Sequence, residues 1–449
     1  MFFTSAQGVL NSSAKSNIKN RGAHTIHSFV NYNAERNKKV SDDPCVQTFN
    51  NTYRSSSFCD AMQATVESKD HNLVISGFMR ETGTDASSEK GTLLKIDKTG
   101  NILLKKKMSQ NGAMIRDVIL LKDSMLLVPS DQNNKLLLTK IDDQFNIIWN
   151  KSFDLGRHIF NYRNMIEAAD GSFYMLIDYD NPYPPFLALI KFSKNGDYLW
   201  QKNYAANNAW AGFWNTRLIE LNGYLYFKTE TEVNGYYPTD VIFKVNMQDG
   251  GIVWTKYYNN PILKFSRSDL FFGYKNHIVL AGGVETEPPV YKSYPVISLI
   301  NEDGSVNKTV IYKSGQLTMS TIISAIATSN GDVIFQTNAN DYSVNPSIYG
   351  YTLIRVDPNL HFESGNLYQL NNNYGGYLME GNDRSIYNYG NNFYPDPYST
   401  DFFLTKYTPD LKSGNCYTQP FSVTDSLIQA SSTTVSFNYS PEITITPAT

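Results

Sequence analysis

The sequence predicts an all-β fold, a seven-bladed β-propeller, because one phrase recurs seven times along its 449 residues. The phrase is an apolar strand, a polar turn and a second strand that often carries tryptophan, as in LIKFSKNGDYLWQKNY from Leu189. A period of about 50 residues with four strand-like stretches per unit is typical of a propeller blade. The apolar residue before each turn recurs at intervals of 45 to 56 residues, at Ile96, Ile141, Phe192, Val245, Ile300, Val356 and Tyr407.

The first unit shows the order of strands that we expect in every blade. Residues 61–68 (AMQATVES) form the innermost strand, LVISGF from Leu73 the second, GTLLKID from Gly91 the third and ILLKKKM from Ile102 the outermost. Asn-Gly and Asp-Gly pairs at the tight turns of later units supply the positive φ that such turns require. Apolar runs in the middle strands indicate sheets buried on both faces, because each blade stacks against two neighbours.

The ring is expected to close between the two ends of the repeat region. The seventh unit ends at its third strand, LTKY from Leu404, without a convincing outer strand after it. Residues 46–53 (VQTFNNTY) precede the first innermost strand and resemble an orphan outer strand. We therefore expect this N-terminal strand to complete the seventh blade, since closure removes an exposed sheet edge.

This pattern divides the chain into three parts. Residues 45–416 form the propeller. Residues 1–44 begin with MFFTSAQ, which resembles the end of a signal peptide cleaved at Ala6, with an ordinary chain start as the alternative. The rest of that segment is polar, so we expect a loosely ordered leader. Residues 417–449 are rich in Ser, Thr and Pro, which indicates an extended tail or linker, or one or two strands.

Composition argues against several kinds of partner. The net charge is −3 and charged residues make up 18% of the chain, without a basic block that could neutralise phosphates. No apolar run approaches the roughly 20 residues needed to span a bilayer. The sequence therefore predicts neither nucleic-acid binding nor membrane insertion.

The long loops predict a binding surface. Antiparallel strands place the tight turns on one face of the ring and the long loops on the other, and those loops are rich in Tyr, Trp and Pro. Aromatic rings on Pro-stiffened loops give a large contact area at low entropic cost. The alternative is that the rings pack on one another and on neighbouring blades. The expected surface, called here the aromatic loop face, comprises Tyr183, Trp210, Trp214, Tyr236, Tyr237, Tyr291, Tyr294, Tyr342, Tyr349, Tyr394 and Tyr398.

The sequence predicts no catalytic residue, metal site or cofactor. Six histidines are scattered without an HExxH pair, and the GxSxG, Walker, Rossmann and DxDxDG patterns are absent from the sequence. Trp149, Trp200 and Trp254 share one repeat position, which indicates packing between blades. The enzymatic alternative is a carbohydrate-active enzyme with acids at the channel mouth, where paired carboxylates about 5–10 Å apart would support hydrolysis.

The three cysteines predict at most one disulfide bond. Cys45 precedes the closing strand and Cys416 follows the turn of the last blade, so both are expected on the tight-turn face, whereas Cys59 is expected near the opposite face. A Cys45–Cys416 bond would therefore join the ring at its seam. The alternative is three buried thiols.

The repeats resemble those of large secreted and cell-surface propeller proteins of Bacteroidota. The shared pattern, apolar-x-K-x-D-x-x-G-x-φ-x-W-x-K-x-aromatic, is matched best at residues 191–204 and 244–257. The opening QTFNNTY and a cysteine soon after the last blade also resemble these proteins, over residues 46–416. The resemblance implies export by type IX secretion and a role in adhesion, gliding or surface assembly. The C-terminal sorting domain usual in such proteins is not visible in this sequence.

A second resemblance is to the repeats of quinoprotein dehydrogenases and of the outer-membrane assembly scaffold that shares their fold. The strings IDKTGNILLK and VNMQDGGIVWTK carry it. Those enzymes have eight blades and a calcium site, whereas this chain has seven units without a matching acid–amide cluster or vicinal cysteine pair. The scaffold remains the closer parallel.

Together these observations predict a non-enzymatic, exported propeller. It would act in surface adhesion or assembly, with a protein or glycan partner at the cell surface. The first alternative is an accessory docking subunit of a type IX secretion, gliding or other envelope complex. The second is the carbohydrate-active enzyme described above.

Overall fold

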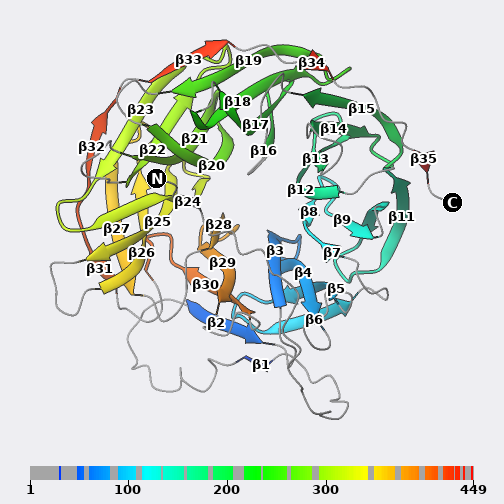
Figure 1. Cartoon of the computed structure of the whole chain (residues 1–449). Coiled ribbons are helices and arrows are strands. Elements are labelled where there is room, and N and C mark those ends of the chain that lie inside the picture. The colour runs from blue at the N-terminus through cyan, green and yellow to red at the C-terminus, as the bar shows by residue number, and fades with distance from the viewer. Residues whose placement is uncertain are drawn as a thin grey trace, which may run out of the picture.

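Small antiparallel sheets follow one another around a ring in the computed structural model of the protein (Figure 1). The described residues form seven such sheets and contain no helix, which confirms the seven-bladed β-propeller. The structure describes residues 30–31, 48–54, 60–80, 89–107, 114–132, 135–155, 159–179, 186–205, 217–233, 236–259, 264–285, 293–341, 348–369, 376–393, 400–412, 418–428, 430–434, 438–439 and 446–447.

The first four blades follow the chain, each from its innermost strand outward. Blade 1 contains β3 (Asp60–Glu67), β4 (Leu73–Arg80), β5 (Glu89–Ile96) and β6 (Ile102–Lys107). Blade 2 contains β7 (Met114–Ile115), β8 (Ile119–Leu120), β9 (Leu126–Gln132), β10 (Lys135–Ile141) and β11 (Ile147–Asp154). Blade 3 contains β12 (Ile159–Glu167), β13 (Phe173–Tyr179), β14 (Phe186–Phe192) and β15 (Tyr198–Ala205). Blade 4 contains β16 (Arg217–Leu221), β17 (Tyr224–Val233), β18 (Tyr236–Asn246) and β19 (Ile252–Asn259).

The remaining blades keep the same order. Blade 5 contains β20 (Lys264–Tyr274), β21 (His277–Glu285), β22 (Ser293–Ile300) and β23 (Val306–Lys313). Blade 6 contains β24 (Thr318–Ala327), β25 (Val333–Asp341), β26 (Ile348–Val356) and β27 (Phe362–Gln369). Blade 7 contains β28 (Tyr377–Glu380), β29 (Ile386–Phe393) and β30 (Thr400–Tyr407), and its outer strand is β2 (Phe49–Arg54).

The ring closes through the N-terminal strand, as the sequence predicts. Strand β2 pairs antiparallel with β30, from Phe49 opposite Lys406 to Tyr53 opposite Phe402. The ring of Tyr53 stacks on that of Phe402 with centroids 4.8 Å apart. Of residues 1–44 the structure describes only β1 (Val30–Asn31), which pairs with the outer edge of β2.

The tight turns repeat one backbone conformation. Each tight turn described within a blade contains a residue with positive φ, the conformation that favours glycine. Glycine occupies this place between the third and fourth strands of blades 1, 3, 4 and 5, which agrees with the sequence-based expectation. In the other three blades the residue is Phe145, Leu360 or Leu411, with φ of 63°, 64° and 63°. The sequence reasoning missed these three because large apolar residues rarely adopt this conformation.

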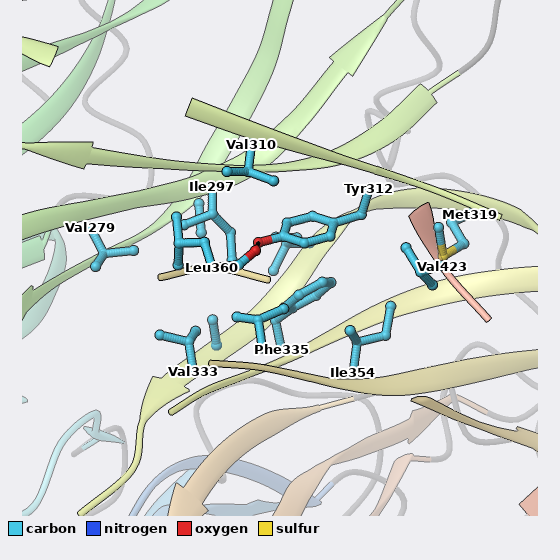
Figure 2. Packing of buried hydrophobic residues seen from close by; sticks show 14 of the residues in the cluster. Val279, Ile297, Val310, Tyr312, Met319, Val333, Phe335, Ile354, Leu360 and Val423 are labelled. Carbon is cyan, nitrogen blue, oxygen red and sulfur yellow. Dashed lines mark hydrogen bonds between the residues drawn. The ribbon is translucent and has the colours of Figure 1, made fainter. Parts of the chain in front are cut away.

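The hydrophobic core is divided among the interfaces between neighbouring blades. Figure 2 shows one of these interfaces, where Tyr312 of blade 5 and Leu360 of blade 6 lie together with Phe335, Val333 and Ile354. Each of these five side chains is at most 1% exposed. The blades are therefore held side by side mainly by apolar burial, the dominant favourable contribution to folding.

A repeated hydrogen bond crosses these interfaces. The Tyr312 hydroxyl donates to the Leu360 carbonyl of the next blade at 3.0 Å (Figure 2). A tyrosine four residues after the tryptophan position makes the same bond to the next blade's turn in other units. The further pairs are Tyr53 to Gly100 (2.7 Å), Tyr204 to Gly250 (2.7 Å), Tyr258 to Gly304 (3.1 Å) and Tyr368 to Leu411. This geometry explains the aromatic residue at the end of the sequence repeat.

The C-terminal tail adds strands to the rim of the propeller (Figure 1). Its described parts pair antiparallel with the outer strands of blades 6, 5, 4, 3 and 2, in that order along the tail. The sequence did not predict this pairing, since the short polar segments have no strand periodicity of their own. The added strands are β31 (Thr418–Pro420), β32 (Thr424–Leu427), β33 (Ser431–Thr434), β34 (Asn438–Tyr439) and β35 (Thr446–Pro447).

Candidate binding site in the channel

A cavity of about 430 Å³ opens among the innermost strands of the ring. Its lining comes from β3, from the segment that joins β7 to β8, and from β12, β16, β28 and β29, so four blades besides blade 2 contribute. The size falls within the range of about 300–1,000 Å³ that is typical of small-molecule sites. The polar and aromatic residues that line it include Gln63, Thr65, Arg116, Asp117, Arg217, Tyr377 and Tyr389.

Three lining residues lie at one level of the ring. Ala64, Arg217 and Tyr377 occupy the same register position in blades 1, 4 and 7. Each pairs with a residue of the second strand, and that residue pairs with a residue of the third strand. In all three blades this third-strand residue lies three positions before the apolar residue that precedes the turn. The innermost strands therefore aim an arginine and a tyrosine into the channel from different blades at equal depth.

A bulge places the carboxyl group of Asp117 beside this level. In blade 2, Ile115 pairs with Ser130 and Ile119 with Leu127, so three residues on the inner strand face two on β9. One of those two is Pro129, which has no N–H to donate to the ladder. The extra residue bends the strand, as bulges do, and the segment containing Asp117 lines the cavity.

The environment of Asp117 raises the pKa of its carboxyl group to near neutral pH. Burial, the largest effect, raises the pKa of this carboxyl to about 7, whereas N–H groups of Val118 and Met165 and the charge of Arg217 act in the opposite direction. The Val118 N–H donates to Oδ1 at 2.9 Å. Asp117 therefore changes charge within the physiological range, unlike an ordinary aspartate.

The two arginines of the cavity differ in their partners. Arg116 forms an ion pair with Asp131, with Nη2 and Oδ2 3.7 Å apart. Within the described part of the chain no carboxylate lies within 4.0 Å of the Arg217 guanidinium, which interacts with Asp117 through charge only. Arg217 is half-buried at the start of β16. Its guanidinium thus retains donors for a ligand.

Two tyrosines form the aromatic wall of the cavity. The rings of Tyr377 and Tyr389 lie with centroids 5.7 Å apart and an interplanar angle of 39°. Burial raises the pKa of Tyr389 well above its usual value, so its hydroxyl stays protonated at neutral pH. The site thus combines an apolar surface with charged groups, as ligand pockets usually do.

Acidic side chains are few in the described lining of the cavity. Asp117 is its one carboxylate among the described residues, whereas glycoside hydrolysis uses two. In the described part of the chain, no three His, Cys, Asp or Glu side chains come together as potential metal ligands. That same part contains no helix capable of crossing a lipid bilayer.

The aromatic loop face lies mostly outside the described residues. This holds for Tyr183, Trp210, Trp214, Tyr291, Tyr342, Tyr394 and Tyr398. Tyr236 and Tyr237 belong to β18 and Tyr349 to β26, where only their backbone is described. The cysteines Cys45 and Cys416 also fall outside, so the disulfide bond stays a prediction.

Tyr294 is the one predicted site residue whose side chain is described. It is half-buried and packs against Val284, Val296 and Ile311, with the Lys313 ammonium 5.2 Å from its ring centroid. These contacts agree with the packing alternative for this tyrosine. The predicted packing role of Trp149, Trp200 and Trp254 also agrees with the structure, since each packs against a core cluster between blades.

The channel residues were missed by the sequence reasoning. Arg116, Asp117, Arg217, Tyr377 and Tyr389 come from three blades, and no local motif joins them. Aligning the innermost strands by their distance from the turn would have shown Arg217 and Tyr377 at one level. The bulge that brings Asp117 to the cavity had a single signal in the sequence, the proline in the adjacent strand.

Comparison with known proteins shows likeness in fold only. No protein-family model matches the sequence, and no curated protein matches it. The chain is similar to virginiamycin B lyase from Staphylococcus aureus, with 14% identity, a TM-score of 0.41 and coverage of 77% of this chain and 94% of the lyase. It is also similar to Drosophila Semaphorin 1b, with 8% identity, a TM-score of 0.42 and coverage of 77% and 84%.

A third similar structure is the exo-beta-1,3-galactanase from Phanerochaete chrysosporium, with 13% identity and a TM-score of 0.32 over 85% of this chain and 79% of that one. These proteins include enzymes and a semaphorin. At such identities and TM-scores they say nothing about the activity of this chain. The class of protein, a seven-bladed β-propeller, is defined by the chain's own sheets.

Proposed function

We propose that this chain is a non-catalytic binding propeller that acts outside the cell in surface adhesion or assembly. It holds a protein or glycan partner with the channel pocket and the aromatic loop face together. The pocket lining supports this proposal most directly, because it joins two arginines and two tyrosines with one carboxyl group among its described residues. Such a lining offers hydrogen-bond donors and apolar contact to a bound ligand.

Export and the surface role rest on the sequence repeats, which resemble Bacteroidota surface propellers. In that setting the partner is a component of the cell surface. A docking subunit of a type IX secretion or gliding complex is the closest variant of this role. The rim, where tail strands already pair with the outer edges of five blades, offers a rigid disc for such docking.

One observation favours a second candidate function, a carbohydrate-active enzyme. Burial raises the pKa of the Asp117 carboxyl to about 7, and such a value suits general acid–base catalysis at neutral pH. The second group that such a reaction requires would have to come from the loops around the channel. Incubation with polysaccharides, followed by reducing-end and ultraviolet assays for products, distinguishes an enzyme from a binder.

Affinity capture from the native cell envelope tests the proposal. The full chain is compared with two variants, one in which Trp210, Trp214, Tyr236 and Tyr237 become alanine and one in which Gln63→Trp fills the pocket. We expect both variants to lose the same partner while their melting temperatures stay close to the parent value. Retention of the partner by both variants, or turnover of a polysaccharide by the parent chain, would overturn the proposal.

A further inference from the structure

We propose that the channel pocket binds the carboxylate group of an acidic sugar, a uronic acid residue, through Arg217, with the sugar ring against Tyr377. This inference rests on the proposed binding function and names its ligand class. Arg217 and Tyr377 lie at one level of the ring, in blades 4 and 7, and both line the cavity.

Arg217 is the anchor for the carboxylate. Its guanidinium has no carboxylate within 4.0 Å in the described part of the chain, whereas Arg116 is engaged by Asp131. A guanidinium presents paired N–H donors that match the two oxygens of a carboxylate. The half-buried position of Arg217 strengthens such a contact because less water competes for it.

The rest of the lining fits a sugar ring. Tyr377 and Tyr389 offer aromatic surface to the C–H face of a pyranose, and Gln63 and Thr65 bring polar side chains for its hydroxyl groups. An acidic peptide would satisfy the arginine equally well. It would not use the aromatic wall and the hydroxyl-pairing groups together, so the observations favour the sugar.

Asp117 makes binding depend on pH. The charged and titratable side chains that line the cavity with it are Arg116 on its own segment, Arg217 from β16, Tyr377 from β28 and the protonated Tyr389 from β29. Strands β3 and β12 contribute none to the described lining. Ionised Asp117 repels a ligand carboxylate, whereas protonated Asp117 can donate a hydrogen bond to it. A uronate remains ionised from pH 6 to pH 8, so it should bind more tightly at pH 6.

Calorimetric titration of the full chain tests the inference, with D-galacturonate, its methyl ester and D-galactose as probes. We expect binding of galacturonate, at least a tenfold loss for the ester and for galactose, and up to about tenfold tighter binding at pH 6 than at pH 8. Arg217→Met should weaken galacturonate binding at least tenfold. Arg384→Met, a change at an exposed arginine in a turn of blade 7, should leave it unchanged.

Specific outcomes would overturn the inference. Equal binding of acid and ester would exclude the guanidinium–carboxylate contact. Preference for galactose or for an acidic peptide such as tetraglutamate would reject the uronate but leave the binding function standing. If no probe binds the pocket, while capture of the partner still depends on the aromatic loop face, the uronate proposal is rejected and the proposed binding function stands.

A variant that fails to fold would not leave the inference untested. Tyr377→Leu keeps Arg217 and removes one of the two rings of the aromatic wall, the one placed against the sugar, and it should weaken galacturonate binding at least severalfold. The pH comparison needs no variant at all. A galacturonate affinity that is the same at pH 6 and pH 8, with no loss in Tyr377→Leu, would contradict the assigned geometry.

Discussion

Neighbouring blades pack through two kinds of interface. In one kind the outer strand of the first blade fills the space between the blades, and in the other a turn of the second blade fills it. Where blades 2, 3 and 4 meet the next blade, a tryptophan of the outer strand covers a glycine in the neighbouring turn. The pairs are Trp149 with Gly196, Trp200 with Gly250 and Trp254 with Gly304. Where blades 1, 5 and 6 meet the next blade, the outer strand has Leu104, Lys308 or Ser364, and the turn supplies the buried Phe145, Leu360 or Leu411.

This difference shows that the interface conserves filled volume rather than residue identity. A Cβ added at Gly196 would lie 2.5 Å from the Trp149 ring, so the first kind of interface has no room for a turn side chain. The second kind accepts a left-handed backbone at Phe145, Leu360 and Leu411, which costs about 1–2 kcal/mol each. Burial of such a side chain returns about 1.5–3 kcal/mol, so the packing offsets the strain.

The largest expected effect comes from emptying a turn-filled interface. Leu360→Ala should lower the free energy of unfolding by about 2–5 kcal/mol, because the leucine is fully buried between blades 5 and 6. Chemical denaturation followed by tryptophan fluorescence measures it. Leu427→Ala is the control, since that side chain is 70% exposed. Equal, small effects for both variants would show that the turn side chain does not hold the interface.

The next effect comes from crowding a tryptophan interface. Gly196→Ala should cost about 1–3 kcal/mol, from contact with the Trp149 ring and from the positive φ of 80°. Trp149→Ser combined with Gly196→Leu, which copies the Ser364 and Leu411 pair, should be less destabilising than the two single changes added together. A double-mutant cycle measures the coupling. Strict additivity would argue against volume exchange between the two positions.

A smaller effect is expected for the hydrogen bond that crosses the interfaces. Tyr312→Phe should cost about 0.5–1.5 kcal/mol, because the buried Leu360 carbonyl loses its donor at 3.0 Å. Blade 2 carries phenylalanine at the equivalent position, Phe153. Phe153→Tyr should therefore stabilise the protein by up to about 1 kcal/mol. Thermal unfolding of both variants checks the pair, and a loss of stability in Phe153→Tyr would contradict the equivalence of the sites.

The smallest effect on global stability should come from shortening the tail. A chain ending at Val423 keeps the buried Phe421 and Val423 but removes the strands that pair with β23 and β19. Hydrogen exchange should rise in both of these outer strands, although one belongs to a tryptophan interface and the other does not. Strands β27 and β6 are the internal controls. An increase in hydrogen exchange confined to β19 would indicate that the tail stabilises the tryptophan interfaces only.

Much of the architecture was predictable because its signals are local. The repeated turn, the apolar runs of the middle strands and the orphan strand at residues 46–53 gave blade number and closure. The tryptophans at one repeat position indicated interface packing. Leu360 and Leu411 were not recognisable as interface residues, since their role depends on a neighbour about 50 residues away. The channel site was not predicted from the sequence for the same reason, because its residues come from separate blades.

The sequence by itself determined the number of blades, the order of strands and the closing strand, because turn conformation and strand alternation depend on neighbouring residues. Only the tertiary structure decided whether the outer strand or the neighbouring turn fills each interface between blades. It also decided where the tail strands pair and which side chains meet in the channel. Those outcomes depend on volume, edge hydrogen bonds and charge between residues that are distant in the chain. The chemistry of Asp117, Arg217 and Tyr377 exists only once the ring has closed around them.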